Sequence, residues 1–147
     1  MLLTTKVHID NDFKDLEVLK MMCYHSARMY NVGLYSVRQH FFNTGEYLSY
    51  YDNYHLCKAN ENYSLLLTDT GQQILRIVDR DMHSFFGLLK LKKLGKYSNP
   101  IHLPKYKDKE GMMTWSVLGR SVRIRNGKAR IGVTNELMEK YNFSNKF

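Results

Sequence analysis

Apolar residues recur at steps of three and four along the stretch from residue 13 to residue 41, and this recurrence constrains the fold more than any other feature. Such a period predicts a long helix that buries one stripe. Asn11 and Asp12 offer an N-terminal cap, and Asn43-Thr44-Gly45 predicts the end of the helix. Gly33 leaves open a division into two helices. The members of the stripe are Phe13, Leu16, Leu19, Cys23, Ala27, Tyr30, Leu34, Val37 and Phe41.

Two further helices are expected before residue 97. Ser49 can cap a shorter one through Tyr50, Tyr54 and Cys57, and a connection at residues 60–62 follows that is too hydrophilic for a core. Thr68 or Asp69 then begins a third helix, which Gly95 ends. Its apolar stripe consists of Ile74, Val78, Met82, Phe85 and Leu89, and its other side carries Gln72, Arg76, Arg80, His83 and Lys90. That second side is either a solvated face or a surface for a polyanion.

Short strands are predicted around these helices. Leu2–Ile9 is rich in Thr, Val and Ile and roughly alternating, and residues 101–104 and 112–117 also favour strands. Asn126-Gly127 lies between two alternating runs and predicts a two-residue type I′ hairpin, because both positions tolerate positive φ. Pairing outward from this turn matches Arg125 with Lys128, Ile124 with Ala129, Arg123 with Arg130, and Val122 with Ile131. A brief capped helix is expected over residues 134–141.

The order of these elements predicts an α+β fold. We expect a small β-barrel or sheet with a block of three to four helices inserted after its first strand. The corresponding domains are residues 1–10 plus 97–147, which form the β-domain, and residues 11–96, which form the helical insertion.

Positive charge is concentrated in the C-terminal part of the chain. Residues 90–130 hold twelve cations and two acids, a net charge of +10, whereas the whole chain carries +8, so the remainder carries −2. A localised field of this kind indicates a polyanionic partner, the alternative being a basic surface kept for solubility. Trp115 lies inside this stretch, where a ring among cations suits base stacking as well as core packing. The tyrosines of residues 47–54 favour the core and rim of a helix pair.

The predicted hairpin places four cations on one face. Arg123 lies opposite Arg130 and Arg125 opposite Lys128, and like charges that face each other across strands repel. Folding alone would not favour this arrangement. A nucleic-acid backbone would supply the missing negative charge, so the sequence predicts a phosphate-binding platform here. The alternative is an exposed hairpin without a specific partner.

Several classes of function are disfavoured by what the chain contains. Cys23 and Cys57 stand apart without metal or redox spacing, and we expect buried, reduced thiols. The histidines are scattered, and no constellation of catalytic groups stands out. No segment approaches the roughly 20 apolar residues of a membrane span. We therefore expect no catalytic residue, no metal, no cofactor and no membrane, and a place inside the cell.

Several segments together resemble the N-terminal part of the TnpB family, also called OrfB. These proteins are transposon-encoded RNA-guided nucleases related to the type V CRISPR effectors. No single motif decides the resemblance, which rests on the order and spacing of the segments over essentially the entire chain. The segments are Ser26-Ala-Arg-Met-Tyr-Asn-Val-Gly-Leu-Tyr-Ser-Val-Arg-Gln39, Tyr47-Leu-Ser-Tyr-Tyr51, Gln72-Gln-Ile-Leu-Arg-Ile-Val-Asp-Arg80, Phe85-Phe86, Leu103-Pro-Lys-Tyr106 and Lys140-Tyr-Asn-Phe-Ser-Asn-Lys-Phe147.

The resemblance implies a wedge domain, a small β-barrel, interrupted after its first strand by a helical recognition domain. In such proteins these domains hold the guide RNA scaffold and read a short duplex motif beside the target, while base pairing reads the rest. The implied partners are guide RNA and duplex DNA next to the target, in the bacterial cytoplasm at the nucleoid. Residues implied near the duplex motif are Tyr30, Asn31, Arg38, Gln72, Arg76, Thr114 and Trp115. Those expected to face RNA or DNA backbone are Lys105, Lys107, Arg120, Arg123, Arg125, Lys128 and Arg130.

The chain departs from the family pattern at its end. Family members continue into a RuvC-like nuclease with three metal-binding carboxylates and into a zinc ribbon, and this chain stops before both, so we expect no DNA cleavage from it. A separate nuclease portion would then be a further partner. Two alternatives stay open: a stand-alone regulator that binds DNA or a protein without any guide, and an enzyme with a hidden active site.

Overall fold

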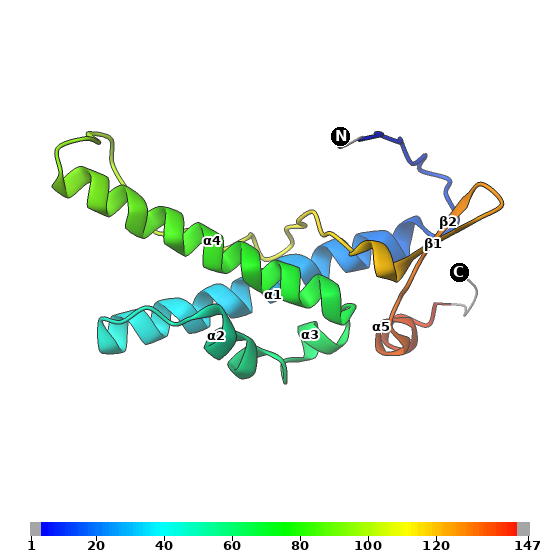
Figure 1. Cartoon of the computed structure of the whole chain (residues 1–147). Helices are drawn as coiled ribbons and strands as arrows, with labels where there is room; N and C mark the ends of the chain where they lie inside the picture. The colour runs from blue at the N-terminus through cyan, green and yellow to red at the C-terminus, as the bar shows by residue number, and fades with distance from the viewer. Residues whose placement is uncertain (1–3, 144–147) are drawn as a thin grey trace.

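The computed structural model describes residues 4–143 and shows a mixed helical and sheet chain (Figure 1). Helices make up 54% of it, and one two-stranded antiparallel sheet lies at one end of the described chain. The elements are α1 (Leu16–Thr44), α2 (Tyr50–Cys57), α3 (Glu61–Ser64), α4 (Thr68–Lys93), the short 3₁₀ turn η1 (Gly119–Ser121), β1 (Val122–Arg125), β2 (Lys128–Ile131) and α5 (Asn135–Lys140).

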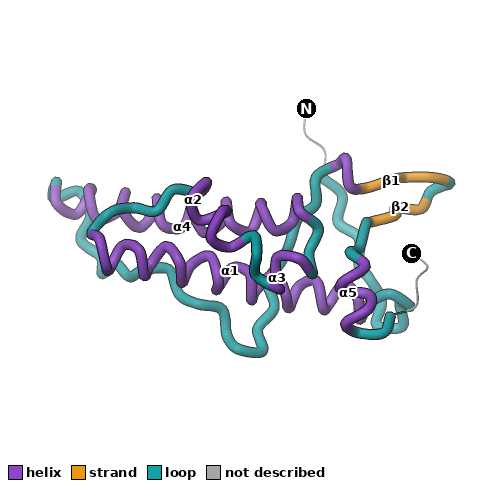
Figure 2. Tube along the Cα trace, turned by 90° about the horizontal axis from the view of Figure 1, so that it is seen from below, coloured by secondary structure: helices purple, strands orange, loops and turns teal. Residues whose placement is uncertain are grey.

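Helices α1 and α4 form the body of the molecule. They run side by side in the same direction, because α2 and α3 return the chain between them (Figures 1 and 2). Their contact stripe is apolar and buried, and it includes Met22, Leu34 and Val37 of α1 and Leu75 and Val78 of α4. Burial of these stripes is the main favourable contribution to the fold.

Gly33 lies inside an uninterrupted α1, so the division into two helices does not occur. A Cβ atom at this position would come within 2.6 Å of Leu75 Cδ2 on α4. The glycine therefore permits the close approach of two helices. Real Cβ atoms do not lie that near another carbon, so a larger residue here requires the helices to shift.

The predicted ends of the helices are confirmed except at the start of α1, which begins at Leu16 after Asp15 and is capped by neither Asn11 nor Asp12. The Ser49 hydroxyl accepts the N–H of Asp52 at 3.2 Å, as an N-cap residue does. Gly45 and Gly95 follow α1 and α4 in the left-handed region, with φ of 73° and 69°. The Thr134 hydroxyl accepts the N–H of Leu137 at 3.3 Å and so caps α5.

The hydrophilic connection at residues 60–62 stays outside the core, as expected, with Asn60 and Asn62 half-buried and Glu61 exposed. It is nevertheless ordered, because it begins α3, whose next residue, Tyr63, is buried. Asn60 caps the helix by accepting the N–H of Asn62 at 2.9 Å. The Asn62 side chain in turn bonds the buried His25 at 2.9 Å. Polar side chains at the edge of the core are thus paired.

The β-part of the prediction needs correction. The sheet is a two-stranded hairpin and not a closed barrel. Residues 4–9 form no strand, and the start of the predicted first strand lies outside the described residues. Residues 101–104 and 112–117 form no strand either. The helical block is present, whereas its insertion into a barrel is not.

Helix α1 supplies hydrogen-bond partners to backbone groups of the segment 97–118. The Asn31 amide donates to the carbonyl of Lys107 at 2.9 Å and accepts its N–H at 2.7 Å. Further along, the N–H of Met113 donates to the carbonyl of Cys23 at 3.2 Å. Buried backbone groups must be paired, and here the helices take the place of a neighbouring strand.

The division of the chain into residues 11–96 and the remainder stays a prediction.

Candidate nucleic-acid interface

The β1–β2 hairpin has the turn and the register that the sequence predicts. Asn126 and Gly127 have φ of 50° and 71°, the positive values that a type I′ turn requires. The observed partners are Val122 with Ile131, Arg123 with Arg130, Ile124 with Ala129, and Arg125 with Lys128. Side chains alternate between the two sides of a strand. The four basic residues therefore share one side of the hairpin.

We call Arg123, Arg125, Lys128 and Arg130 the cationic face. All four are exposed, and together they line a shallow hollow of about 140 Å³. No ion pair joins any of them to a carboxylate within residues 4–143. Their mutual repulsion is thus not compensated inside the described part of the protein, and an anion placed in the hollow would be attracted by all of them.

The opposite side of the hairpin is apolar but only partly covered. Ile124, near the turn, remains 76% exposed. Its cross-strand partner Ala129, and Ile131 nearer the base, line an apolar groove together with Phe13 and Leu19 from the start of the helical block. The hairpin therefore extends beyond the body from its base, as Figure 1 shows at the right-hand end.

Arg120 anchors the hairpin to the helical block. Its guanidinium donates two hydrogen bonds to the Asp69 carboxylate on α4, and the Ser121 hydroxyl donates a third at 2.8 Å. The hydrogen bonds from Arg120, together with that from Ser121, hold the pKa of Asp69 below its usual range. Arg120 was expected to face a phosphate, and the structure instead places its charge against a carboxylate that is 8% exposed.

Tyr30 and Trp115 contact the core and do not stand out from the surface. Tyr30 is 2% exposed, and its hydroxyl donates to Asp81 Oδ2 at 2.8 Å. Burial, followed by the hydrogen bond to Asp81, raises its pKa. Trp115 is half-buried and packs against the hydrophobic core near Cys23. Sequence reasoning placed both residues beside DNA, and their surroundings give them a structural role.

Arg38 and Asn31 belong to a row of polar and aromatic side chains along α1. This row, which we call the outer stripe, consists of Tyr24, Arg28, Asn31, Tyr35, Arg38 and Phe42, spaced three and four residues apart. Arg28 lies over the Tyr24 ring at 4.9 Å, and Arg38 lies between the rings of Phe42, at 5.7 Å, and Tyr106, at 4.9 Å. The alternation of rings and cations is its distinguishing property.

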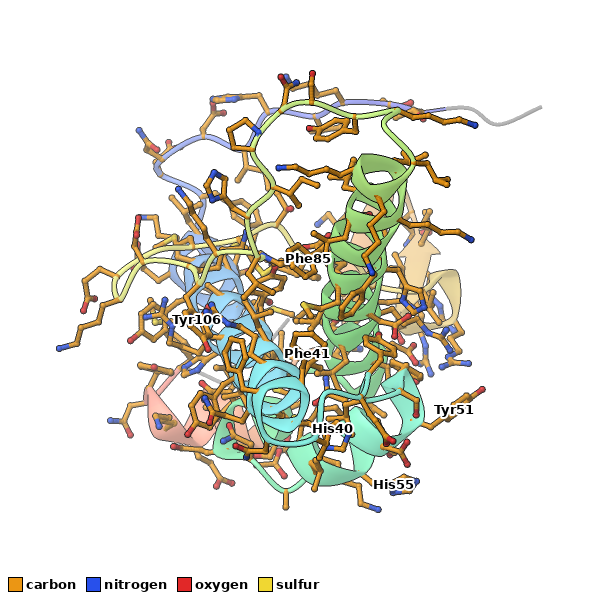
Figure 3. All side chains as sticks on the ribbon, turned by 90° about the vertical axis from the view of Figure 1, so that its left-hand side faces the viewer. His40, Phe41, Tyr51, His55, Phe85 and Tyr106 are labelled. Atoms are coloured by element: carbon orange, nitrogen blue, oxygen red, sulfur yellow. The ribbon has the colours of Figure 1, made fainter. Side chains whose placement is uncertain are left out.

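The segment 105–108 lies across the outer stripe. Besides the pair of bonds from Asn31, the Arg28 guanidinium donates to the carbonyl of Asp108. The ammonium of Lys107 lies over the Tyr30 ring at 4.7 Å, and Lys105 is exposed. Figure 3 shows Tyr106 on the side of α1 away from α4. This arrangement joins residues that are far apart in the sequence into one surface.

Of the two α4 residues expected near the duplex motif, Arg76 is exposed and Gln72 is half-buried. The Arg76 guanidinium lies over the Tyr50 ring of α2 at 4.4 Å. Gln72, one turn earlier, is close to the Tyr63 hydroxyl. Thr114 is exposed in the segment between α4 and the hairpin. The predicted site residues are therefore not one cluster. They divide between the hairpin, the outer stripe and the α2–α4 surface.

Sequence reasoning missed Arg28, Tyr35 and Tyr106 as members of a surface. The spacing of three and four residues that revealed the buried stripe of α1 also runs through the outer stripe. Tyr106 has no such signal, because its place depends on the contacts that Asn31 and Arg38 make with the segment 105–108. The contact of Asn31 with Lys107 joins residues 76 positions apart along the chain.

Other kinds of site find little support among residues 4–143. No group of three or more His, Cys, Asp or Glu side chains could hold a metal ion there. None of the described helices combines the length and apolar character needed to cross a membrane. Comparison with family models, curated proteins and solved structures gives no match to this chain. The geometry of the described residues therefore carries the functional argument.

Proposed function

We propose that this chain is a nucleic-acid-binding module that holds phosphates on the cationic face of its hairpin. The observation that carries the proposal is the pairing of Arg123 with Arg130 and of Arg125 with Lys128, all exposed and without a carboxylate partner in residues 4–143. Phosphates neutralise such a cluster, and arginine binds them with two parallel hydrogen bonds. The net charge of +8 adds long-range attraction.

The anchor of the hairpin supports the same proposal. Asp69 accepts hydrogen bonds from Arg120 and Ser121, so this carboxylate is held at the base of the hairpin and away from the cationic face. A rigid connection between the hairpin and α4 also gives a bound backbone a defined orientation relative to the helices. Backbone contacts of this kind set position and carry no sequence information themselves.

We propose a TnpB-type role for the module: guide RNA on the hairpin, and duplex DNA next to the target on the helical block. The resemblance of the sequence segments supports this, as do the exposed Arg76 and Thr114. Tyr30, Asn31 and Trp115 contribute by stabilising the fold that presents these surfaces. In this role the module binds at the bacterial nucleoid and leaves cleavage to a separate nuclease portion.

Nucleic acid that accompanies the protein from cells tests the proposal. The ratio of absorbance at 260 and 280 nm is measured for the purified chain, and the bound material is sequenced. A discrete RNA supports binding of a guide scaffold. If RNA-free protein binds duplex DNA as tightly as the protein with RNA does, the guide-dependent role is contradicted and the chain is a stand-alone regulator. Protein without nucleic acid, which binds neither RNA nor duplex, contradicts the proposal as a whole.

A further inference from the structure

We infer that the outer stripe of α1 holds an unpaired nucleobase in an open hollow beside Tyr35 and Tyr106. The inference rests on the proposed function and adds to it a second kind of contact, stacking on a base, at a place distant in sequence from the hairpin. The hollow measures about 420 Å³ and is lined by Asn31, Val32, Tyr35, Ser36, Asn60 and Tyr106.

The two rings of the hollow are accessible. Tyr35 is 57% exposed and Tyr106 is 41% exposed, whereas Tyr30 and Tyr63 in the neighbouring core are buried. No other ring or cation lies over Tyr35 among the described residues, whereas Arg38 covers one face of the Tyr106 ring. A planar ligand that covers either ring would remove this apolar area from water.

Cations stand beside these rings. Arg38 lies over Tyr106 at 4.9 Å, Lys105 is exposed next to it in the chain, and Lys107 follows at the ring of Tyr30. A base stacked on a tyrosine carries a phosphate on each side along the strand, and positive groups beside the rings would attract these phosphates. Rings alternating with cations therefore favour a nucleotide over an uncharged planar ligand.

The hollow is also held in a fixed shape. Both backbone polar groups of Lys107 bond to the Asn31 amide, which fixes the neighbouring Tyr106 against α1. Asn60, on the other rim, is fixed as the cap of α3 by its bond to the Asn62 N–H at 2.9 Å. Because the walls are already ordered, a ligand loses little of its binding free energy to ordering the protein.

The occupant is an unpaired nucleotide and not a continuous duplex. In a duplex each base is covered on both faces by its neighbours, so its ring cannot stack on a tyrosine. Every base has such a face, and the hollow should therefore tolerate any sequence. A loop, bulge or single-stranded end of an RNA would supply the unpaired base.

Single-stranded RNA that carries one 2-aminopurine tests the inference, with a matched duplex as the second probe. Stacking should quench the fluorescence of the wild-type complex. Tyr35→Ala with Tyr106→Ala should weaken the binding of the single strand by roughly 5- to 150-fold, the range for one lost stacked base. Tyr35→Phe with Tyr106→Phe keeps both rings and should retain the wild-type affinity. Duplex binding should be the same for all three proteins.

An abasic position in the strand provides a test that needs no variant. It should weaken binding to the wild-type protein and have no further effect on the double alanine variant, because both changes remove the same contact. Single-strand affinity that is unchanged in the alanine variant overturns the stacking site. If Arg123→Glu with Arg130→Glu still abolishes binding in that case, the phosphate-binding proposal stands. If the wild-type chain binds neither probe, both proposals fail.

Discussion

The side-chain amide of Asn31 bonds both backbone polar groups of Lys107, donating to its carbonyl at 2.9 Å and accepting its N–H at 2.7 Å. A helix side chain thus pairs with both backbone groups of one residue, as a neighbouring strand would. This relationship connects α1 to the segment that follows α4 and leaves neither backbone group of Lys107 without a partner.

Asn31→Ala should destabilise the fold, because it leaves both backbone groups of Lys107 without their partner. The expected loss in the free energy of unfolding is about 1–3 kcal/mol, measured by urea denaturation. Asn31→Asp retains the acceptor and removes the donor, so its loss should be smaller. An alanine variant as stable as the wild type would show that water replaces the amide without cost.

Two glycines in helices should respond in opposite ways to alanine. Gly33→Ala places a Cβ within 2.6 Å of Leu75 Cδ2 and should destabilise the protein by roughly 1–3 kcal/mol through overpacking. Gly87→Ala meets no described atom within 4 Å, and it should stabilise α4 by about 0.5–1 kcal/mol. Thermal denaturation of both variants checks the prediction, and similar effects from the two would refute the proposed close contact.

Stability should decrease as the pH falls below about 6.5, because of His25. Burial lowers the pKa of this side chain from 6.5, and its Nε2 lies 2.7 Å from the Tyr141 hydroxyl. The unfolded chain then binds more protons than the folded one, so the stability decreases until the pH reaches the folded pKa. Urea denaturation at about pH 7.5 and pH 5 measures the difference. His25→Gln should reduce it, and an unchanged pH response in that variant would exclude His25.

The interaction of Arg120 and Ser121 with Asp69, which anchors the hairpin, should be lost at acidic pH. Hydrogen bonds from Arg120 and Ser121 lower the pKa of Asp69 from 3.8, so the stabilisation is fully present above that pH and is lost as the pH falls through the folded pKa. Amide chemical shifts of β1 and β2 should follow this change. Asp69→Asn should produce the shifted state at neutral pH, and hairpin shifts identical to the wild type would contradict the assigned anchor.

The parts of the fold that the sequence predicts are those with local causes. The 3.6-residue period, the Ser49 and Thr134 caps and the Asn126-Gly127 turn each act within a few residues, and each is confirmed. The barrel was predicted from short alternating segments, whose backbone partners are decided by tertiary contacts. Residues 101–104 and 112–117 lie along helices instead.

The candidate site also has one part that local sequence patterns predict and another that depends on tertiary contacts. The cationic face follows from the turn and the alternation of strand residues, both of which are local. The ion pair of Arg120 with Asp69 and the burial of Tyr30 depend on the packing of distant elements, so sequence reasoning assigned these side chains to a ligand. Tyr106 joins the outer stripe through contacts with α1 that no local pattern indicates.

The salt dependence of RNA and duplex binding tests the central claim most directly. For the wild type, the logarithm of the association constant should fall steeply with the logarithm of salt concentration, by roughly 0.7 to 0.9 per neutralised phosphate. Arg123→Glu with Arg130→Glu should preserve the circular dichroism spectrum and lower this slope by about 2. Lys58→Glu with Lys96→Glu makes the same change in net charge at exposed positions after α2 and after α4, away from the hairpin, and should leave the slope near the wild-type value. Equal slopes and affinities for the two variants would contradict a phosphate platform on the hairpin.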